Sequence, residues 1–151
     1  MEDLTQPRVR YGRAAPEPMR ALSSIEQYLE GCGLAPALLD LVQLRASLLN
    51  GCAYCLQRHS HEARARGERV ERLFQLGAWP ESPVFSEQER AALEWTDAVT
   101  NVQSGHVPEE VYQRARRQFT EKELVDLTWA IAAINAWNRL SIAFRYPPEI
   151  R

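Results

Sequence analysis

Apolar residues recur at helical spacing along almost the whole chain after about residue 15, and this pattern limits the possible folds more than any other feature. Apolar side chains three and four residues apart share one face of a helix, whereas strands show alternation, and no alternating run of β-branched residues is found here. The sequence therefore predicts an all-α fold. We expect a single domain at residues 16–151, preceded by an extended N-terminal arm at residues 1–15.

Helix limits follow from prolines at starts, glycines at ends and capping boxes. The predicted helices cover about 16–30, 36–50, 52–67, 70–76, 86–102, 108–119 and 121–144, with a loop at 79–83. Asn50 and Gly51 both accept the left-handed conformation that ends helices. The helices on either side of this pair are therefore predicted to form an antiparallel hairpin.

The last predicted helix is apolar around its whole circumference, which indicates burial on several sides. Its apolar residues are Leu124, Val125, Leu127, Trp129, Ile131, Ala132, Ile134, Trp137, Leu140 and Ile142. A chain of 151 residues offers few neighbours to cover so much surface, so part of this helix is expected to contact another subunit. Asn135 and Asn138 on the same helix need hydrogen-bond partners if they are buried.

Charge and cysteine content restrict the class of function. Lys and Arg number 18 against 20 Asp and Glu, a net charge of -2, which argues against a nucleic-acid groove and gives no support for binding to anionic membranes. No apolar run is long enough for a membrane span, and residues 1–4 lack a signal-peptide pattern. Three cysteines are a poor match to a secreted disulfide framework, so a cytoplasmic protein is expected.

The segment whose side chains are best suited to catalysis contains Cys52, Cys55 and His59. These residues are three and four positions apart and so share one helix face. Both sulfurs lie in a first helical turn, where unpaired N–H groups and the helix dipole favour an anion. This position lowers the pKa of a thiol, and the thiolate is its reactive form. His59 is one turn from Cys55 and can accept its proton, so the pattern predicts a redox or peroxidatic site.

Two plainer interpretations of the cysteine pair remain. Buried cysteines are often inert core residues. Two Cys and one His also supply three zinc ligands, but no second Cys or His cluster provides a fourth. We favour the redox interpretation and expect neither a metal nor a cofactor. Cys32 is assigned a structural role, and His61 and His106 are assigned to the surface or to an interface.

Asp40 is the fourth candidate. If the chain reverses at residues 50–51, Asp40 and His59 lie at similar depths, about 15 and 12 Å from the turn, because a helix rises about 1.5 Å per residue. A carboxylate there can orient His59 and stabilise its charged form. The alternative is a solvated acid near the positive end of a helix, and the pattern alone leaves both open.

The segment from Asp40 through Cys52 and Cys55 to His59 resembles the alkylhydroperoxidase D-like proteins of the carboxymuconolactone decarboxylase superfamily. Their motif is Glu, eleven residues, Cys-x-x-Cys, three residues, His. The spacing here matches fully, with Asp40 in place of the usual Glu. Residues 87–100 and 123–139 also resemble later helices of that family, so the likeness extends from about residue 11 to 147.

The resemblance implies an all-helical subunit that assembles into trimers or hexamers and reduces hydroperoxides. In that cycle Cys55, as the more buried sulfur, attacks the peroxide and becomes a sulfenic acid, and Cys52 then forms a disulfide with it. His59 takes the thiol proton and Asp40 holds His59. Reduction requires an outside dithiol, such as a lipoyl-bearing or thioredoxin-like protein.

Two other functions stay open. The superfamily also includes lactone decarboxylases, whose reaction does not need paired cysteines. An oligomeric protein without catalytic activity can use such cysteines to sense oxidation. Among the four tryptophans, which are assigned to packing, Trp137 is the one that can line a pocket.

Overall fold

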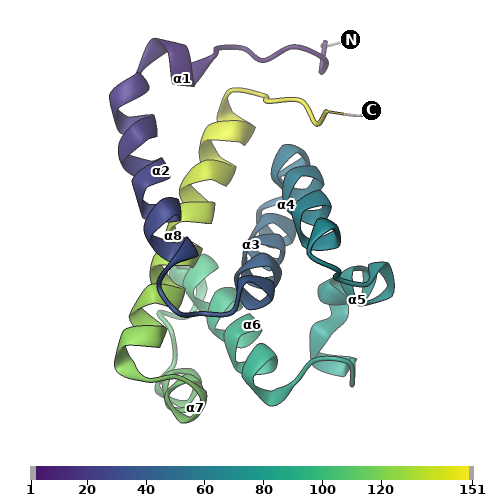
Figure 1. The fold of residues 1–151 in the computed structure, drawn as a ribbon, viewed down its shortest axis with the longest axis vertical. Helices are drawn as coiled ribbons and strands as arrows, with labels where there is room; N and C mark the ends of the chain where they lie inside the picture. Colours follow the sequence, from purple (N-terminus) through teal and green to yellow (C-terminus); the bar gives the residue numbers. More distant parts are fainter. Residues whose placement is uncertain (1–2, 150–151) are drawn as a thin grey trace.

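Helix α3 (Pro36–Asn50) is the central element of the computed structural model, which describes residues 3–149 (Figure 1). It packs against α4 (Ala53–Ala65), α6 (Glu87–Thr100) and α8 (Glu121–Ala143). The other elements are α1 (Tyr11–Ala14), α2 (Pro16–Glu30), α5 (Val70–Gln75), η1 (Leu76–Glu81), η2 (Val102–Ser104) and α7 (Glu109–Gln118). Every regular element within the described residues is helical, which confirms the predicted all-α fold. Residues 1, 2, 150 and 151 of the predicted arm and domain lie outside the described part.

Capping boxes begin the two helices for which the sequence predicts them. Ser86 accepts a hydrogen bond from the backbone N–H of Glu89, whose side chain accepts one from the backbone of Ser86. Thr120 and Glu123 repeat the arrangement at the start of α8. Each box satisfies two N–H groups that a helix N-terminus would otherwise leave unpaired.

The predicted reversal between α3 and α4 is confirmed at Gly51. Its φ of 69° lies in the left-handed region, which glycine adopts without steric cost. The N–H groups of Gly51 and Cys52 donate to the carbonyls of Leu48 and Ser47, so the end of α3 is capped by the residues that turn the chain. Cys52 thereby becomes the residue that caps the N-terminus of α4.

The N-terminal arm differs from its prediction, because it includes one helical turn, α1. The ring of Tyr11 packs against the C-terminal end of the molecule, with ring centroids 5.9 Å from Phe144 and 4.8 Å from Tyr146. The backbone N–H of Arg8 donates to the carbonyl of Phe144 at 2.8 Å. These long-range contacts, which no local pattern encodes, hold the arm against α8.

The loop predicted at residues 79–83 also differs, since the helical element η1 continues through Glu81. The guanidinium of Arg90 on α6 donates to the carbonyls of Trp79, Pro80 and Ser82 at 2.9–3.2 Å. A side chain from a later helix thus supplies the hydrogen bonds that make this compact turn stable.

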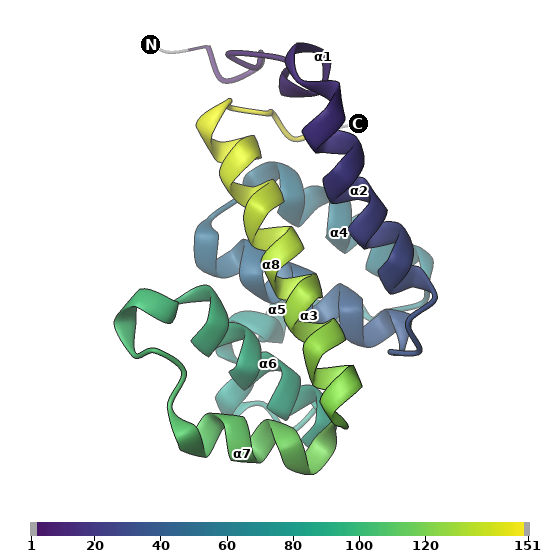
Figure 2. The same ribbon diagram turned by 90° about the vertical axis from the view of Figure 1, so that its left-hand side faces the viewer.

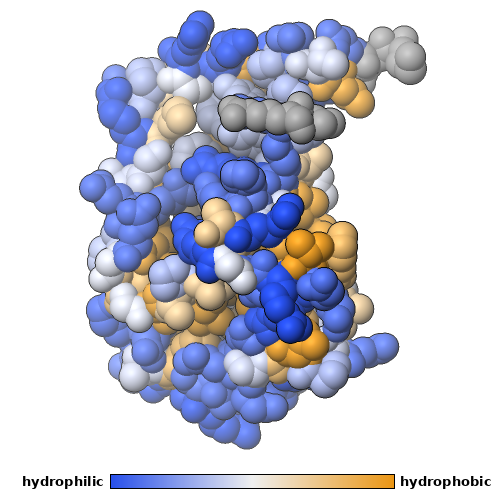
Figure 3. Space-filling model, turned by 45° about the vertical axis from the view of Figure 1, so that its right-hand side comes forward, coloured by the Kyte–Doolittle hydropathy of each residue, from blue (hydrophilic) through white to orange (hydrophobic). Residues whose placement is uncertain are grey.

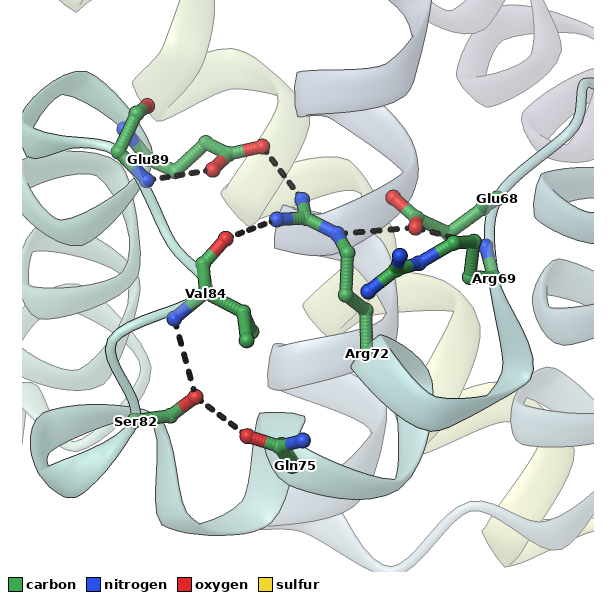
Figure 4. A network of polar contacts seen from close by, with 8 residues as sticks. Glu68, Arg69, Arg72, Gln75, Ser82, Val84 and Glu89 are labelled. Atoms are coloured by element: carbon green, nitrogen blue, oxygen red, sulfur yellow. Dashed lines mark hydrogen bonds and ion pairs between the residues drawn. The ribbon is translucent and has the colours of Figure 1, made fainter.

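Helix α5 is tied to the start of α6 by Arg72 (Figure 4). Its guanidinium lies 2.9 Å from a Glu68 oxygen and 2.6 Å from Oε1 of Glu89, and it also donates to the carbonyl of Val84. Glu89 therefore completes the α6 capping box with one oxygen and binds Arg72 with the other. This network fixes the segment that follows α4 against the core.

Helix α8 is buried on several sides, as predicted, yet part of it faces outward next to α2 (Figure 2). Val125 is 55% exposed and Trp129 51%, and with Ile25 and Tyr28 of α2 they line an open groove of about 360 Å³. A different face, drawn in Figure 3, is mostly hydrophilic, with hydrophobic atoms gathered along its lower right side. Among the helices of residues 3–149, none has both the length and the apolar character that a bilayer span requires.

Candidate functional site

The two cysteines of the predicted motif lie together in a small apolar cluster between α3, α4 and α8. Cys52 caps α4, and its Sγ accepts a hydrogen bond from the backbone N–H of Cys55 at 3.3 Å. Both thiols are free, and both residues are almost fully buried, at 1% and 3% exposed, so residue exposure does not distinguish the two sulfurs. Cys55 lines a cavity of about 300 Å³, whereas Cys52 is not part of its lining.

The electrostatic surroundings make Cys55 the more acidic thiol. A hydrogen bond from the Cys52 thiol is the largest influence, and it lowers the pKa of Cys55 to about 6 against the opposing effect of burial. The side chains of Asn138 and Ser141 and the charge of His59 act in the same direction. Donating that hydrogen bond raises the pKa of Cys52, so Cys55 carries the thiolate and Cys52 keeps its proton.

Asn138 is held in place by a polar network that satisfies its buried amide. It donates to Oγ of Ser47 at 3.0 Å and accepts from Asn50 at 2.9 Å, and Asn50 also donates to Asn135. The hydrogen bonds predicted for both asparagines of α8 are therefore present. An amide nitrogen carries two hydrogens, so Asn138 has one left to direct at the sulfurs.

His59 is paired with a residue that the sequence analysis did not name. Its Nδ1 lies 3.0 Å from Oε2 of Glu62, one helical turn further on. That contact lowers the pKa of Glu62 to about 2, so Glu62 is ionised and can only accept a hydrogen bond. The proton of a neutral His59 therefore belongs on Nδ1, which leaves Nε2 as the basic nitrogen.

Asp40 does not hold His59 directly, and this corrects the expected contact. Its Oδ1 accepts a hydrogen bond from Arg66 at 2.7 Å, while its buried Oδ2 meets no partner among the described residues. Burial raises the pKa of Asp40, although Arg66 opposes that shift. The predicted similarity in depth is correct, because Asp40, His59 and Glu62 line one cavity of about 250 Å³. Glu62, and not Asp40, contacts His59, because Glu62 lies one turn further along the same helix.

The missed residues continue the spacing of the motif. Positions 52, 55, 59, 62 and 66 alternate steps of three and four, so Glu62 and Arg66 extend the helix face that begins with Cys52. Following that face beyond His59 would have identified both residues.

Aromatic rings from two segments that are distant in the sequence line the Cys55 cavity. Tyr11 and Tyr146 line it together with Tyr54, whose ring meets Tyr146 edge-on at 5.6 Å. Gln57 of α4 and the backbone of Glu149 exchange hydrogen bonds in both directions, which holds the C-terminal tail over the site. Trp137 also lines the cavity, a position that the sequence analysis left open for this tryptophan although it assigned all four to packing.

The remaining candidates lie away from this cavity. Cys32 is half-buried beyond the end of α2, where its carbonyl accepts from Lys122 at 3.1 Å. His61 and His106 are exposed. Within residues 3–149, no group of three or more metal-ligating side chains is placed to hold an ion, so the zinc interpretation gains no support.

The chain matches a known protein family and has relatives of similar sequence. The model of the carboxymuconolactone decarboxylase family matches residues 16–98. The uncharacterized protein YdfG of Bacillus subtilis (strain 168) is 40% identical over 136 residues, covering 90% of this chain and 92% of its own. The uncharacterized protein YnjA of Escherichia coli (strain K12) is 28% identical, covering 77% of this chain and 63% of its own.

Solved structures share the fold. A protein of unknown function from Agrobacterium tumefaciens, described as a candidate antioxidant defence protein AhpD, superposes with a TM-score of 0.93 at 38% identity, covering 97% of this chain and 100% of that one. The debrominase Bmp8 superposes with a TM-score of 0.78 at 22% identity, covering 89% of this chain and 72% of that one. At that identity the likeness to Bmp8 concerns the fold alone.

Proposed function

Because the chain belongs to the carboxymuconolactone decarboxylase family, and because Cys55 of its cysteine pair lines one cavity together with His59, we propose that it is a thiol-dependent peroxidase acting on organic hydroperoxides. The observation that carries this proposal is the acidic thiol of Cys55, which faces a cavity that His59 also lines. The antioxidant description of the Agrobacterium tumefaciens protein supports the same class of substrate.

In the first step, the thiolate of Cys55, whose proton His59 has accepted at Nε2, attacks the terminal oxygen of the hydroperoxide. An S–O bond forms while the O–O bond breaks, and its electron pair leaves on the alkoxide. The alkoxide takes up one proton, so the products are an alcohol and the sulfenic acid of Cys55. Glu62 is the residue that orients His59 in this step, because it fixes the Nδ1 proton.

In the second step, the thiol of Cys52 attacks the sulfenic sulfur. An S–S bond forms and water leaves with the proton of Cys52, which gives a Cys52–Cys55 disulfide. An outside dithiol then reduces this disulfide by two exchanges. Over the whole cycle, one hydroperoxide and one dithiol become one alcohol, one water and one disulfide.

Asp40 is proposed as a positioning residue that acts through the end of α4. Its ion pair with Arg66 holds that end against α3, and Glu62 lies one turn before Arg66 on the same face. The partners proposed for the cycle are a lipoyl-bearing or thioredoxin-like dithiol and further copies of this chain, as a trimer or hexamer. A cytoplasmic location fits free thiols that must be kept reduced.

The test is consumption of cumene hydroperoxide with dihydrolipoamide as the reductant, comparing the wild type with Cys55→Ser and Cys52→Ser. Cys32→Ser is the matched control, since this third cysteine lies outside the cavity. We expect Cys55→Ser to abolish turnover and Cys32→Ser to leave it unchanged. Mass spectrometry after stoichiometric peroxide should locate a 52–55 disulfide, and equal turnover by wild type and Cys55→Ser would contradict the proposal.

The family name favours a second candidate, decarboxylation of a lactone acid. That activity does not require the sulfurs, so a variant with both Cys52 and Cys55 changed to Ser would retain it. Formation of the disulfide without turnover would instead favour a protein that senses oxidation. The turnover and disulfide measurements above separate oxidation sensing from peroxidase activity, and an assay of lactone decarboxylation with the doubly substituted variant tests the second candidate.

A further inference from the structure

A buried hydrogen-bond donor without an acceptor lies in the wall of the Cys55 cavity. Nε1 of Trp137 is shielded from solvent and makes no hydrogen bond within residues 3–149. Its ring contacts that of Tyr11, which lines the same cavity, with the centroids 6.5 Å apart. Leaving a buried N–H unpaired costs free energy, and such a donor is satisfied when an acceptor enters the cavity.

Glu26 of α2 is the acidic residue that lines the same cavity as this indole. The indole acts on the Glu26 carboxyl group as a neighbouring donor, yet the two do not complete a hydrogen bond. Burial raises the pKa of Glu26, although Arg58 and His59 of α4 oppose the shift. Glu26 also lines the adjoining cavity that contains Asp40 and Glu62, so it lies at the boundary between the two.

The line along which the thiolate attacks determines which cavity residues can contact each of the two peroxide oxygens. Cys55 and His59 come from one face of α4, whereas Glu26 and Trp137 come from α2 and α8. A thiolate attacks along the line of the O–O bond, so the leaving oxygen points away from the sulfur. Groups on the other walls of the cavity are therefore better placed for that oxygen than His59, which is one turn from Cys55.

We propose that Trp137 and Glu26 bind the leaving oxygen of the hydroperoxide, the indole N–H by donating a hydrogen bond and the carboxylic acid by donating its proton. This assignment rests on the proposed peroxidase function. The O–O electron pair passes to the alkoxide oxygen, which takes the Glu26 proton and leaves as an alcohol. His59, protonated by Cys55 in the same turnover, returns a proton to Glu26, so no further acid is needed.

The test measures two reactions of the reduced protein. The first is a single turnover with cumene hydroperoxide, followed by quenching and mapping of the 52–55 disulfide. The second is alkylation of Cys55 by iodoacetamide, which depends on the thiolate but has no leaving oxygen. We expect Glu26→Gln and Trp137→Phe to slow the peroxide reaction by about tenfold or more, since a positioned acid contributes roughly 10²–10⁴-fold. Alkylation should stay within about threefold of the wild type, as expected when the thiolate itself is unchanged.

Two further variants support the comparison. Glu30→Gln removes an exposed acid one turn along α2 that lines the neighbouring cavity but not that of Cys55, and it should react like the wild type. Glu26→Asp retains an acid and should recover part of the peroxide rate that Glu26→Gln loses. Circular dichroism and thermal unfolding establish that each variant is folded.

The possible results separate this assignment from the function on which it rests. If the wild type reacts with peroxide and both variants keep its rate, the leaving-oxygen site is wrong and the peroxidase proposal stands. If peroxide reaction and alkylation fall equally, the two residues only support Cys55, and the assignment is again wrong. If the wild type itself does not react with peroxide, the proposed function fails, and this assignment fails with it.

Discussion

At the scale of single residues, the acidity of Cys55 comes from a neighbour rather than from the helix terminus. The sequence pattern attributes a low thiol pKa to unpaired N–H groups in the first turn. In the structure, the N–H of Cys55 is used by the sulfur of Cys52, and the thiol of Cys52 in turn donates to Cys55. On the proposed cycle, Cys52 would therefore both stabilise the thiolate of Cys55 and later form the disulfide with it.

Replacing Cys52 should raise the pKa of Cys55. In Cys52→Ala the donor is lost, so the midpoint of the pH profile for alkylation should move from about 6 toward the ordinary value. At pH 7 this shift lowers the thiolate fraction from about nine tenths to a few per cent, taking an ordinary cysteine pKa of about 8.5. Alkylation rates measured between pH 5 and 9, with the modified peptide located by mass spectrometry, test this.

Cys52→Ser is the matched variant, because a hydroxyl can still donate to Cys55. Its midpoint should lie between those of the wild type and Cys52→Ala. Identical midpoints for all three proteins would mean that Cys52 does not set the acidity of Cys55.

Glu62→Gln should reduce the peroxide rate more than Asp40→Asn. The amide removes the charge that fixes the Nδ1 proton of His59, and we expect a loss of about tenfold, a part of the roughly 10²–10⁴-fold that a positioned base contributes. Asp40 contacts Arg66 instead of His59, so its amide should have the smaller effect. Single-turnover rates of the two variants decide the order, and a larger loss in Asp40→Asn would return the orienting role to Asp40.

The sequence identifies the cysteines and histidine of the site but not their partners. Spacing on one helix places Cys52, Cys55 and His59 correctly, because a helix has fixed geometry. The pairing of Asp40 depends on which of two nearby side chains reaches it across the α3–α4 interface, and Arg66 does so. Such competition is decided by packing and cannot be inferred from spacing alone.

At the scale of elements, the site depends on how α3 ends. The left-handed Gly51 turns the chain so that Cys52 caps α4 and both sulfurs enter the cluster with Ala46 and Ile134. Capping boxes and this glycine are local signals, so the limits of α3, α6 and α8 could be predicted. The one-turn helix α1 and the element η1 could not, because aromatic contacts and Arg90 from distant segments stabilise them.

Gly51→Ala should lower the free energy of unfolding by about 1–2 kcal/mol, the cost of a left-handed conformation for a residue with a Cβ atom. Nothing lies within 4 Å of the added methyl group, so the backbone is the source of the loss. Urea unfolding followed by circular dichroism measures the change.

Gly77→Ala is the control for this prediction. Gly77 also has open space around it, but its φ is not positive, so the free energy of unfolding should change by less than about 0.5 kcal/mol. Equal losses in the two variants would contradict a special conformation at Gly51.

At the scale of the whole molecule, one apolar face of the helical bundle has no cover in a single chain. The groove between α2 and α8 is lined by Ile25, Tyr28, Val125 and Trp129, and a monomer rarely leaves such groups together in water. The all-round apolar character of α8 predicts a subunit contact from the sequence, and the exposed residues show which part of α8 is available for it.

Val125→Glu should therefore reduce self-association. A charge placed in an apolar interface is unpaired when buried, so the mass measured by sedimentation equilibrium should fall toward that of one chain. Phe74→Glu is the control, since Phe74 is 82% exposed on α5 and lies outside this groove. A wild type that is already monomeric at micromolar concentration would contradict the expected oligomer.

Tyr11 and Tyr146, which are distant in the sequence, meet at the Cys55 cavity, and this arrangement separates access to the sulfur from the stability of the bundle. Segments outside the packed helices open at lower free energy than the helices themselves do. The Tyr11–Tyr146 contact can therefore part while α3, α4 and α8 stay folded. On the proposed cycle, a bulky dithiol would reach the Cys52–Cys55 disulfide only when these two rings move apart, so their separation would limit the rate of its reduction.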